Sequence, residues 1–105
     1  MCGIAGYFGP SSQSPSKPEI LSCLNLMKRR GPDVQKYKIE KFGKKTLLML
    51  HSRLSIIDPN PNSNQPMEDT NGIISFNGEI FNYLEIKKKF EFKKLKNSSD
   101  TEVLL

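Results

Sequence analysis

The chain has 105 residues, which suffices for one domain and leaves no room for two. With 36% hydrophobic and 26% charged residues, its composition is that of a globular protein and excludes a disordered chain. No basic segment followed by a long apolar run opens the sequence, and the longest apolar stretch, residues 47–50, is far too short to cross a bilayer. We therefore expect a cytoplasmic protein that makes no contact with a membrane.

The net charge of +5 comes largely from residues 87–96, which hold six lysines and one acidic residue. Such a basic stretch is compatible with a nucleic-acid or membrane surface. It contains no arginine, however, and its two phenylalanines, Phe90 and Phe92, alternate as buried strand positions do. We favour a solvated face of a helix and of the strand after it, and we expect no nucleic-acid partner.

The first third of the chain predicts a strand, a loop and a helix. Residues 2–8 form the strand, and the serine- and proline-rich residues that follow Pro10 form the loop. Ser16 and Glu19 have the spacing of a capping box, and apolar residues then recur at helical spacing. The Gly-Pro pair at 31–32 ends the helix.

The middle of the chain predicts mainly strands. Two of them, over residues 34–42 and 46–57, are joined by a turn at Gly43. The second is apolar enough to be buried on both faces. Residues 58–71 are rich in proline, asparagine and serine and predict a long loop, after which residues 72–76 form another strand.

Three short elements are predicted in the last quarter. A capping pair at 82 and 85 starts a short helix, alternating apolar residues over 90–95 indicate a strand, and a second capping pair at 99 and 102 starts a helix over 101–105. Nucleating this last helix costs free energy, and the helix is too short to gain much stability from propagation. We therefore expect the chain to be the front of a longer domain. The elements together predict an α+β fold with helices packed against a sheet.

Reactive side chains are few. Cys2 and Cys23 are far apart and form no C-x-x-C motif, so neither a redox motif nor a metal site is predicted. Cys2 is either a small apolar strand residue or, once Met1 is removed, a first residue that carries both a thiol and a free α-amine. His51 is a candidate general base for a Cys/His pair, but within an apolar strand we interpret it as a hydrogen-bonded core residue.

Three polar positions each allow a structural and a functional interpretation. Arg53 lies in an apolar strand and needs a partner, either Asp58 or a substrate carboxylate, and the residues alone do not decide between them. The Asn-Gly pair at 77–78 is typical of a hairpin turn. Helix-capping residues follow it closely, however, so a return strand would be short. The alternative role of the pair is an oxyanion hole. Asp100 is interpreted as an ordinary first-turn helix residue rather than as a ligand for an ammonium group.

Six short motifs follow one another along the chain: MCGIAGYFG, RRGPD, RLSIID, QPM, NGEIFNY and SSDTEVLL. In this order they resemble the glutamine amidotransferase domain of the N-terminal-nucleophile class, and within that class the asparagine synthetases. The resemblance implies an N-terminal-nucleophile hydrolase sandwich of αββα type. The family's domain is considerably longer than this chain and is followed by an ATP-using synthetase domain, so residues 1–105 would be one partial domain, truncated to about its front half.

The resemblance assigns the chemistry to Cys2, Asn77 and Gly78. Removal of Met1 would leave Cys2 with a free α-amine, whose pKa of about 7.7–8.0 lets it accept the thiol proton. The thiolate would attack the side-chain amide of glutamine, and Asn77 and Gly78 would stabilise the oxyanion. Ammonia would leave, and water would release glutamate from the thioester.

The resemblance also implies how glutamine is bound. Arg53 would hold its α-carboxylate, Glu79 and Asp100 would bind its α-amino group, and backbone groups of residues 54–57 would line the pocket. The full set of predicted substrate-binding residues is Arg53, Leu54, Ser55, Ile56, Ile57, Asn77, Gly78, Glu79 and Asp100.

Partners and cofactors follow from the same resemblance. Glutamine is the expected substrate, and a synthetase domain, or a second chain that carries the rest of the domain, is the expected partner. ATP and Mg²⁺ are expected only in that synthetase domain, and no cofactor is expected in this chain. Two other classes stay open: a catalytically inactive regulatory or interaction module with the same partial fold, and a small nucleic-acid binder that uses residues 87–96.

Overall fold

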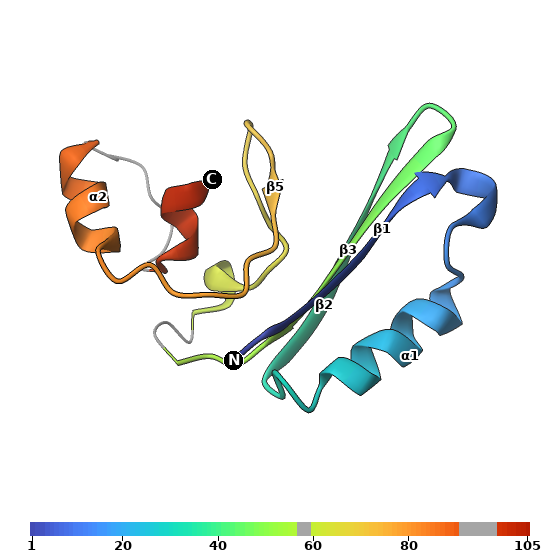
Figure 1. Ribbon diagram of the computed structural model, residues 1–105, viewed down its shortest axis with the longest axis horizontal. Helices are drawn as coiled ribbons and strands as arrows, with labels where there is room; N and C mark the ends of the chain where they lie inside the picture. Colours follow the sequence, from blue (N-terminus) through green and yellow to red (C-terminus); the bar gives the residue numbers. More distant parts are fainter. Residues whose placement is uncertain (57–59, 91–98) are drawn as a thin grey trace.

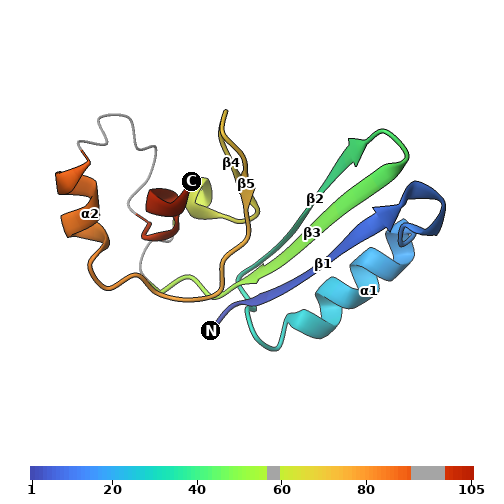
Figure 2. The same cartoon turned by 45° about the horizontal axis from the view of Figure 1, so that its top comes forward.

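The computed structural model describes residues 1–56, 60–90 and 99–105 and divides them into two regions. The sheet region, residues 3–53, is a three-stranded antiparallel sheet with one α-helix lying along it. The loop region, residues 60–90 and 99–105, contains a two-stranded sheet and a short α-helix joined by irregular segments. Figures 1 and 2 show the loop region beside the end of the sheet where the chain begins.

The central strand of the larger sheet is β3, Lys45–Arg53, which pairs with β1, Gly3–Pro10, and with β2, Val34–Phe42. Both pairings are antiparallel. The turn between β2 and β3 contains Gly43 at φ 60°, a backbone conformation that glycine adopts without strain. The predicted strand over 34–42 is confirmed, and the first strand, predicted over 2–8, begins and ends slightly later.

The predicted strand over residues 46–57 is too long, because β3 ends at Arg53. The ladder with β1 ends where Ser52 pairs with Gly3, the first residue of β1. The ladder with β2 ends where Arg53 pairs with Val34, the first residue of β2. Beyond these positions the ladders stop, and the Asp33 N–H still donates to the Arg53 carbonyl oxygen at 3.0 Å. Residues 54–56 therefore leave the ladder, and residues 57–59 lie outside the described residues.

Helix α1, Lys17–Met27, confirms the predicted helix. The carboxylate of Glu19 accepts hydrogen bonds from the hydroxyl and the backbone N–H of Ser16, both at 2.7 Å, and these bonds lower the pKa of Glu19. The helix buries Ile20 and Leu24 against the sheet. These contacts fix which face of the sheet the helix covers.

The hydrophobic core lies between α1 and one face of the sheet, where Ile20 and Leu24 meet Leu48 and Leu50 of β3. On the opposite face the side chains of Ile4 and Phe8 are 51% and 62% exposed. Residues Leu47 and Met49 of β3, which point to that face, are only half-buried. Burial of β3 on both faces is therefore confirmed only over its last three residues, 51–53.

In the loop region a 3-10 helix, Pro61–Ser63, precedes the short strands β4, Met67–Glu68, and β5, Ile73–Ile74. The predicted loop over 58–71 thus contains a strand, and the strand predicted over 72–76 has only two residues. Asp69 turns the chain between them by accepting hydrogen bonds from the backbone N–H groups of Asn71 and Gly72. A local side-chain turn replaces a longer ladder here.

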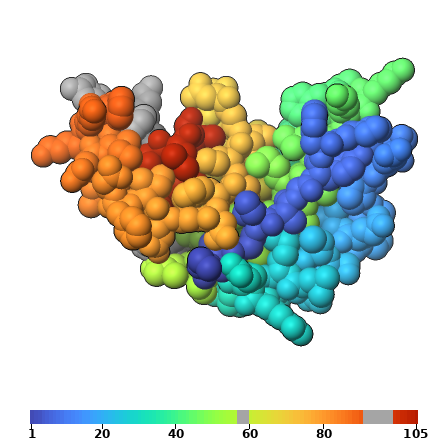
Figure 3. Space-filling model, viewed as in Figure 1, coloured from blue at the N-terminus to red at the C-terminus, as the bar shows by residue number. Residues whose placement is uncertain are grey.

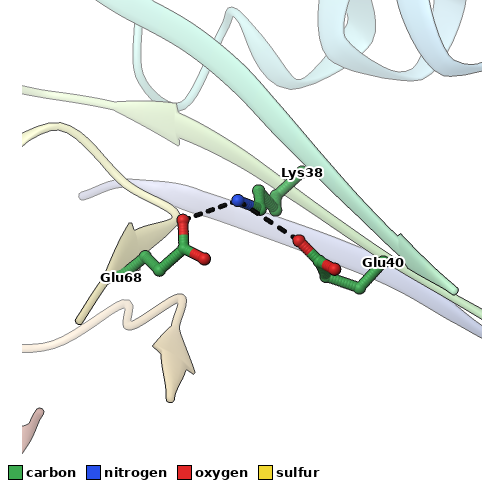
Figure 4. A network of polar contacts seen from close by, with 3 residues as sticks. All are labelled: Lys38, Glu40 and Glu68. Atoms are coloured by element: carbon green, nitrogen blue, oxygen red, sulfur yellow. Dashed lines mark hydrogen bonds and ion pairs between the residues drawn. The ribbon is translucent and has the colours of Figure 1, made fainter. Parts of the chain in front are cut away.

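One ion-pair network fastens β4 to the larger sheet. Figure 4 shows Lys38 of β2 between Glu40 of the same strand and Glu68 of β4. Its Nζ lies 2.5 Å from a carboxylate oxygen of Glu68 and 3.2 Å from one of Glu40, and both contacts raise the pKa of Lys38. The three side chains stay partly exposed, so this is a surface attachment.

The loop region ends in α2, Tyr83–Lys89, and a 3-10 helix, Thr101–Leu104. Asn82 precedes α2 without a side-chain capping bond, and Asp100, not Ser99, occupies the cap position of the last helix. The predicted capping boxes at 82–85 and 99–102 are therefore not formed. Phe90, predicted as a buried strand residue, follows α2 and is 62% exposed, while Phe92 and Leu95 lie outside the described residues.

Two sheets and two α-helices make this a mixed fold, compatible with the predicted α+β class, across the described part of the chain. Among the same residues, no helix has the length and apolar character needed to cross a membrane.

Candidate active site

A pocket of about 390 Å³ opens where the start of β1, the end of β3 and the loop region meet. Figure 3 shows the beginning of the chain, in blue, against the orange residues of the loop region. Eight of the ten predicted site residues line this pocket. They are Cys2, Arg53, Leu54, Ile56, Asn77, Gly78, Glu79 and Asp100.

The other two predicted residues are placed differently. Ile57 lies outside the described residues. Ser55 is not among the residues that line the pocket, and its backbone N–H donates to a carboxylate oxygen of Asp33 at 2.7 Å. Asp33 belongs to the RRGPD motif, so this motif holds the chain just after β3 rather than touching the pocket.

The half-buried thiol of Cys2 lies beside the backbone of Leu54. The Leu54 N–H points to Cys2 Sγ at 3.4 Å, and the same sulfur lies 3.9 Å from the Leu54 carbonyl oxygen. This neighbourhood follows from the antiparallel register. Gly3 pairs with Ser52, so Cys2, which precedes Gly3, lies beside the residues that follow Ser52 at the end of the sheet. Met1 is 75% exposed and also lines the pocket, so its removal would widen the space next to Cys2.

Arg53 is the last residue of β3 and is only 7% exposed. Its Nη1 donates to the Asn60 carbonyl oxygen at 3.2 Å and to Asn64 Oδ1 at 2.8 Å. These two oxygens orient the guanidinium at the end of β3. The alternative partner, Asp58, lies outside the described residues.

The Asn77–Gly78 pair does not form the β-hairpin that is favoured when the pair is considered alone. Strand β5 pairs with β4, which precedes it, and the chain after Gly78 continues towards α2. Both residues are exposed on an irregular segment that borders the pocket. The backbone is close to the ring of Phe76 here, since a Cβ built on Gly78 would lie 2.6 Å from Phe76 Cζ.

Asp100 is 7% exposed and stands at the N-cap position of the last helix, but its side chain makes no capping hydrogen bond there. Instead its Oδ2 accepts a hydrogen bond from the backbone N–H of Ile80 at 2.8 Å. The interpretation of the Asp100 side chain as an ordinary helix-capping group is therefore wrong. Its carboxylate fixes the segment that carries Asn77 and Gly78, and it borders the pocket as well.

Two buried side chains, His51 behind the pocket and Gln65 in its lining, are absent from the predicted site. His51 is fully buried, and its Nε2 lies 3.3 Å from the Phe76 carbonyl oxygen. Gln65, from the QPM motif, accepts from the Phe76 N–H at 2.5 Å and donates to Thr101 Oγ1 at 3.1 Å. Side-chain contacts to a distant backbone group leave no periodicity in the sequence. The only signal that pointed to either contact was the QPM motif, which contains Gln65.

The prediction that His51 is a hydrogen-bonded core residue is confirmed. Burial lowers the pKa of His51 most, the hydrogen bond to Phe76 raises it in part, and the positive charge of Arg53 lowers it further. The imidazole is thus kept neutral. It is not among the residues that line the pocket, which places it behind Phe76 rather than beside Cys2 as a general base.

Residues 1–56, 60–90 and 99–105 contain no group of three or more histidine, cysteine, aspartate or glutamate side chains that would hold a metal ion. The chemical groups gathered at the pocket are a thiol, an exposed amide, a guanidinium and two carboxylates. Groups of opposite charge around a thiol suit an amino-acid substrate and a nucleophilic reaction.

Comparison with known families agrees with this arrangement. A sequence model of the glutamine amidotransferase domain matches residues 1–105, and the chain belongs to that family. The resemblance indicated by the six motifs is thereby confirmed. No solved structure matches the chain.

Among individual relatives, the chain is 35% identical over 106 residues to a probable glutamine-hydrolysing asparagine synthetase of Acanthamoeba polyphaga mimivirus. It is 40% identical over 112 residues to glutamine-hydrolysing asparagine synthetase 1 of Bacillus subtilis. A third relative, a putative enzyme of the same name from Methanocaldococcus jannaschii, is 37% identical over 123 residues. All three alignments include 100% of this chain but only 19%, 17% and 23% of the relatives, so the chain spans about a fifth of their length.

Proposed function

We propose that this chain carries the front of a glutaminase site, which hydrolyses glutamine to glutamate and ammonia for an asparagine synthetase-like enzyme. One observation carries the proposal: a single pocket is lined by Cys2, Arg53, the Asn77–Gly78 pair and Asp100. These residues come from separate stretches of the sequence. A fold that served only structural purposes would have no need to gather them around one space.

The proposed nucleophile is the thiol of Cys2 after Met1 has been removed. The free α-amine takes the thiol proton, and the sulfur forms a bond to the side-chain carbonyl carbon of glutamine. Asn77 and Gly78 stabilise the negative oxygen that develops, a contribution of about 2.7–4 kcal/mol per donor in comparable sites. The carbon–nitrogen bond breaks, ammonia leaves with the proton, and water hydrolyses the thioester to give glutamate and the free thiol.

Charge placement supports the choice of an amino acid as substrate. The guanidinium of Arg53 lines the pocket, and its planar fork of N–H donors is suited to an α-carboxylate. Asp100 and Glu79 supply negative charge for the α-amino group. The backbone of Leu54 and Ile56, which line the pocket, is proposed to border the space between these two ends.

We further propose that residues 1–105 are one partial domain of an αββα sandwich of the N-terminal-nucleophile hydrolase type. The support is the apolar sheet face opposite α1, where Ile4 and Phe8 are more than half exposed. Apolar surface of this kind is buried in a sandwich. A synthetase domain is the proposed partner, because the relatives are named as synthetases, and ATP and Mg²⁺ would belong to that domain.

The proposed function is tested in the natural polypeptide that contains this chain. Intact-mass measurement is expected to show that Met1 has been removed, and ammonia release from glutamine is expected in the unsubstituted protein. Cys2→Ala should abolish this release. Cys23→Ala is the matched control, because Cys23 is also half-buried but packs within α1, 3.8 Å from Met27 Sδ. Retained Met1, or equal loss in both variants, would contradict the proposed nucleophile, and a protein without hydrolysis would be an inactive module.

A further inference from the structure

The peptide groups on either side of Phe76 are held by two buried side chains from different parts of the chain. His51 reaches the carbonyl oxygen from β3, and Gln65 reaches the N–H from the segment before β4. Their exposed fractions are 0% and 7%. Phe76 is the residue immediately before the proposed oxyanion pair, so its backbone sets where that pair begins.

The chemistry of the two contacts fixes their direction. A backbone N–H can only donate, so the atom of Gln65 that faces Phe76 is its carbonyl oxygen, and its NH₂ group is left for Thr101. A carbonyl can only accept, so His51 carries its proton on Nε2. A neutral imidazole fulfils this role, which agrees with the lowered pKa of His51.

The far end of the same segment is also held. Asp100 accepts from the Ile80 N–H at 2.8 Å, and Thr101, which follows it, accepts from Gln65 at 3.1 Å. Gln65 therefore touches both the start of the oxyanion segment and the residue beside the proposed amino-group ligand. Residues 77–79, between the two anchors, are exposed and belong to no helix or strand.

We propose that His51 and Gln65 form a clamp on Phe76 that positions Asn77 and Gly78 as the oxyanion hole, and that Gln65 also couples this segment to Asp100. The proposal rests on the proposed glutaminase function. His51 does not line the pocket and acts only through the backbone of Phe76. Gln65 lines the pocket as well, and it positions the segment through its bonds to Phe76 and Thr101. Such positioning matters because displacements near 1 Å cost about 10²-fold in rate.

The coupling predicts different kinetic effects for the two residues. His51→Leu removes the contact to Phe76 alone, so kcat is expected to fall about 10- to 100-fold, below the loss of an oxyanion donor itself, with KM unchanged. Gln65→Met removes contacts at both ends of the segment. It is expected to lower kcat by a similar factor and to raise KM as well, because Asp100 loses its neighbouring support and the lining of the pocket changes at Gln65.

The experiment measures ammonia release from glutamine by the natural polypeptide that contains this chain, in both variants and in two controls. His51→Gln keeps a side-chain N–H that reaches towards Phe76, and it is expected to recover most of the lost kcat. Thr46→Val removes another buried hydrogen bond of β3, the 2.8 Å contact to Ser11 Oγ, and is expected to leave kcat and KM near their unsubstituted values. In parallel, the rate of Cys2 alkylation by iodoacetamide is measured, a reaction that requires no oxyanion hole. This rate should be the same in the unsubstituted protein and in all four variants.

The possible results separate the two proposals. If the unsubstituted protein hydrolyses no glutamine, the proposed function is overturned and the clamp has no catalytic meaning. If hydrolysis is present and both His51→Leu and Gln65→Met retain full kcat, the clamp alone is overturned. It is likewise overturned if His51→Gln loses as much activity as His51→Leu, or if Cys2 alkylation slows in step with kcat, because both results would indicate a general structural role.

Discussion

The sheet region and the loop region are stabilised by different kinds of contact. In the sheet region, two antiparallel ladders and a cluster of apolar side chains hold strands of eight and nine residues against a helix. In the loop region the two strands have two residues each, and single side chains such as Gln65, Asp69 and Asp100 bind backbone N–H groups. The first region supplies a rigid base, and the second carries the exposed part of the proposed site on polar contacts.

This contrast assigns stability and activity to different residues. Substitutions in the apolar cluster should act on folding, whereas substitutions in the polar contacts of the pocket should act on catalysis. The predictions below test whether the two regions separate in this way, beginning with the largest expected effect.

Leu48→Ala should destabilise the protein by about 2–5 kcal/mol, because Leu48 is 2% exposed at the centre of the apolar cluster. Denaturant unfolding of the natural polypeptide measures the change. Leu26→Ala is the control, since Leu26 lies on α1 but is 73% exposed, and should have little effect. A large loss of kcat per folded molecule in Leu48→Ala would show that the two regions are not separable.

Asn77→Ala should leave folding unchanged, because the side chain is exposed, while kcat for glutamine falls about 10²–10³-fold. Steady-state kinetics measure this loss. Asn82→Ala is the control: Asn82 is also exposed in the loop region and makes no side-chain capping bond to α2. Equal activity of the two variants would remove Asn77 from the oxyanion hole.

Arg53→Lys should weaken glutamine binding by about 1.5–3 kcal/mol, because lysine cannot offer two parallel N–H donors to the α-carboxylate. The effect should appear mainly as a higher KM. Arg53 also donates to the backbone of Asn60 and the side chain of Asn64, so its unfolding curve must be measured alongside. Unfolding of the variant with an unchanged KM would assign Arg53 to the structure of the loop region and not to substrate.

The same contrast explains what the sequence could predict. Helix α1 was predicted because helical spacing and the Ser16–Glu19 pair are local signals in the sequence, and the strand over 34–42 was predicted with its turn at Gly43. The end of β3 was misplaced, since it depends on where the neighbouring strands begin, and no property of residues 54–57 records this. The pairing of β4 with β5 was not predicted either, because β4 lies within residues 58–71, whose proline, asparagine and serine content indicates a loop.

The candidate site was predictable only in part. Cys2, Arg53 and the Asn77–Gly78 pair were indicated by motif order, and their gathering in one pocket agrees with that prediction without testing their roles. Gln65 and His51 were not predicted as site residues, because their contacts are made to the backbone of Phe76, which any residue at 76 would supply. A side chain that binds a distant peptide group leaves no pattern of its own in the sequence.

Acidification should destabilise the protein through His51. The pKa of His51 is lowered on folding, so above the usual value of 6.5 the imidazole is neutral in both the folded and the unfolded protein. As the pH falls below 6.5, the unfolded protein binds a proton first. The free energy of unfolding therefore decreases until the pH reaches the lower pKa of the folded protein. Protonation would place a positive charge near Arg53 and opposite Lys36, with the apolar Ile4 on the other side. Urea unfolding between pH 7.5 and about pH 5 should therefore show a steeper decline for the unsubstituted protein than for His51→Gln. Parallel curves would mean that His51 titrates normally.

The smallest expected effect concerns the attachment between the two regions. Lys38→Met removes the partner of Glu68 and Glu40, and since all three side chains are partly exposed, solvent and salt screen much of their attraction. Thermal unfolding at low salt should show a slightly lower Tm for Lys38→Met than for Lys41→Met, an exposed lysine of the same strand. The difference should disappear at about 1 M salt, where the Debye length is about 3 Å. A difference that persists in high salt would mean that the aliphatic part of Lys38, rather than its charge, attaches the loop region to the sheet region.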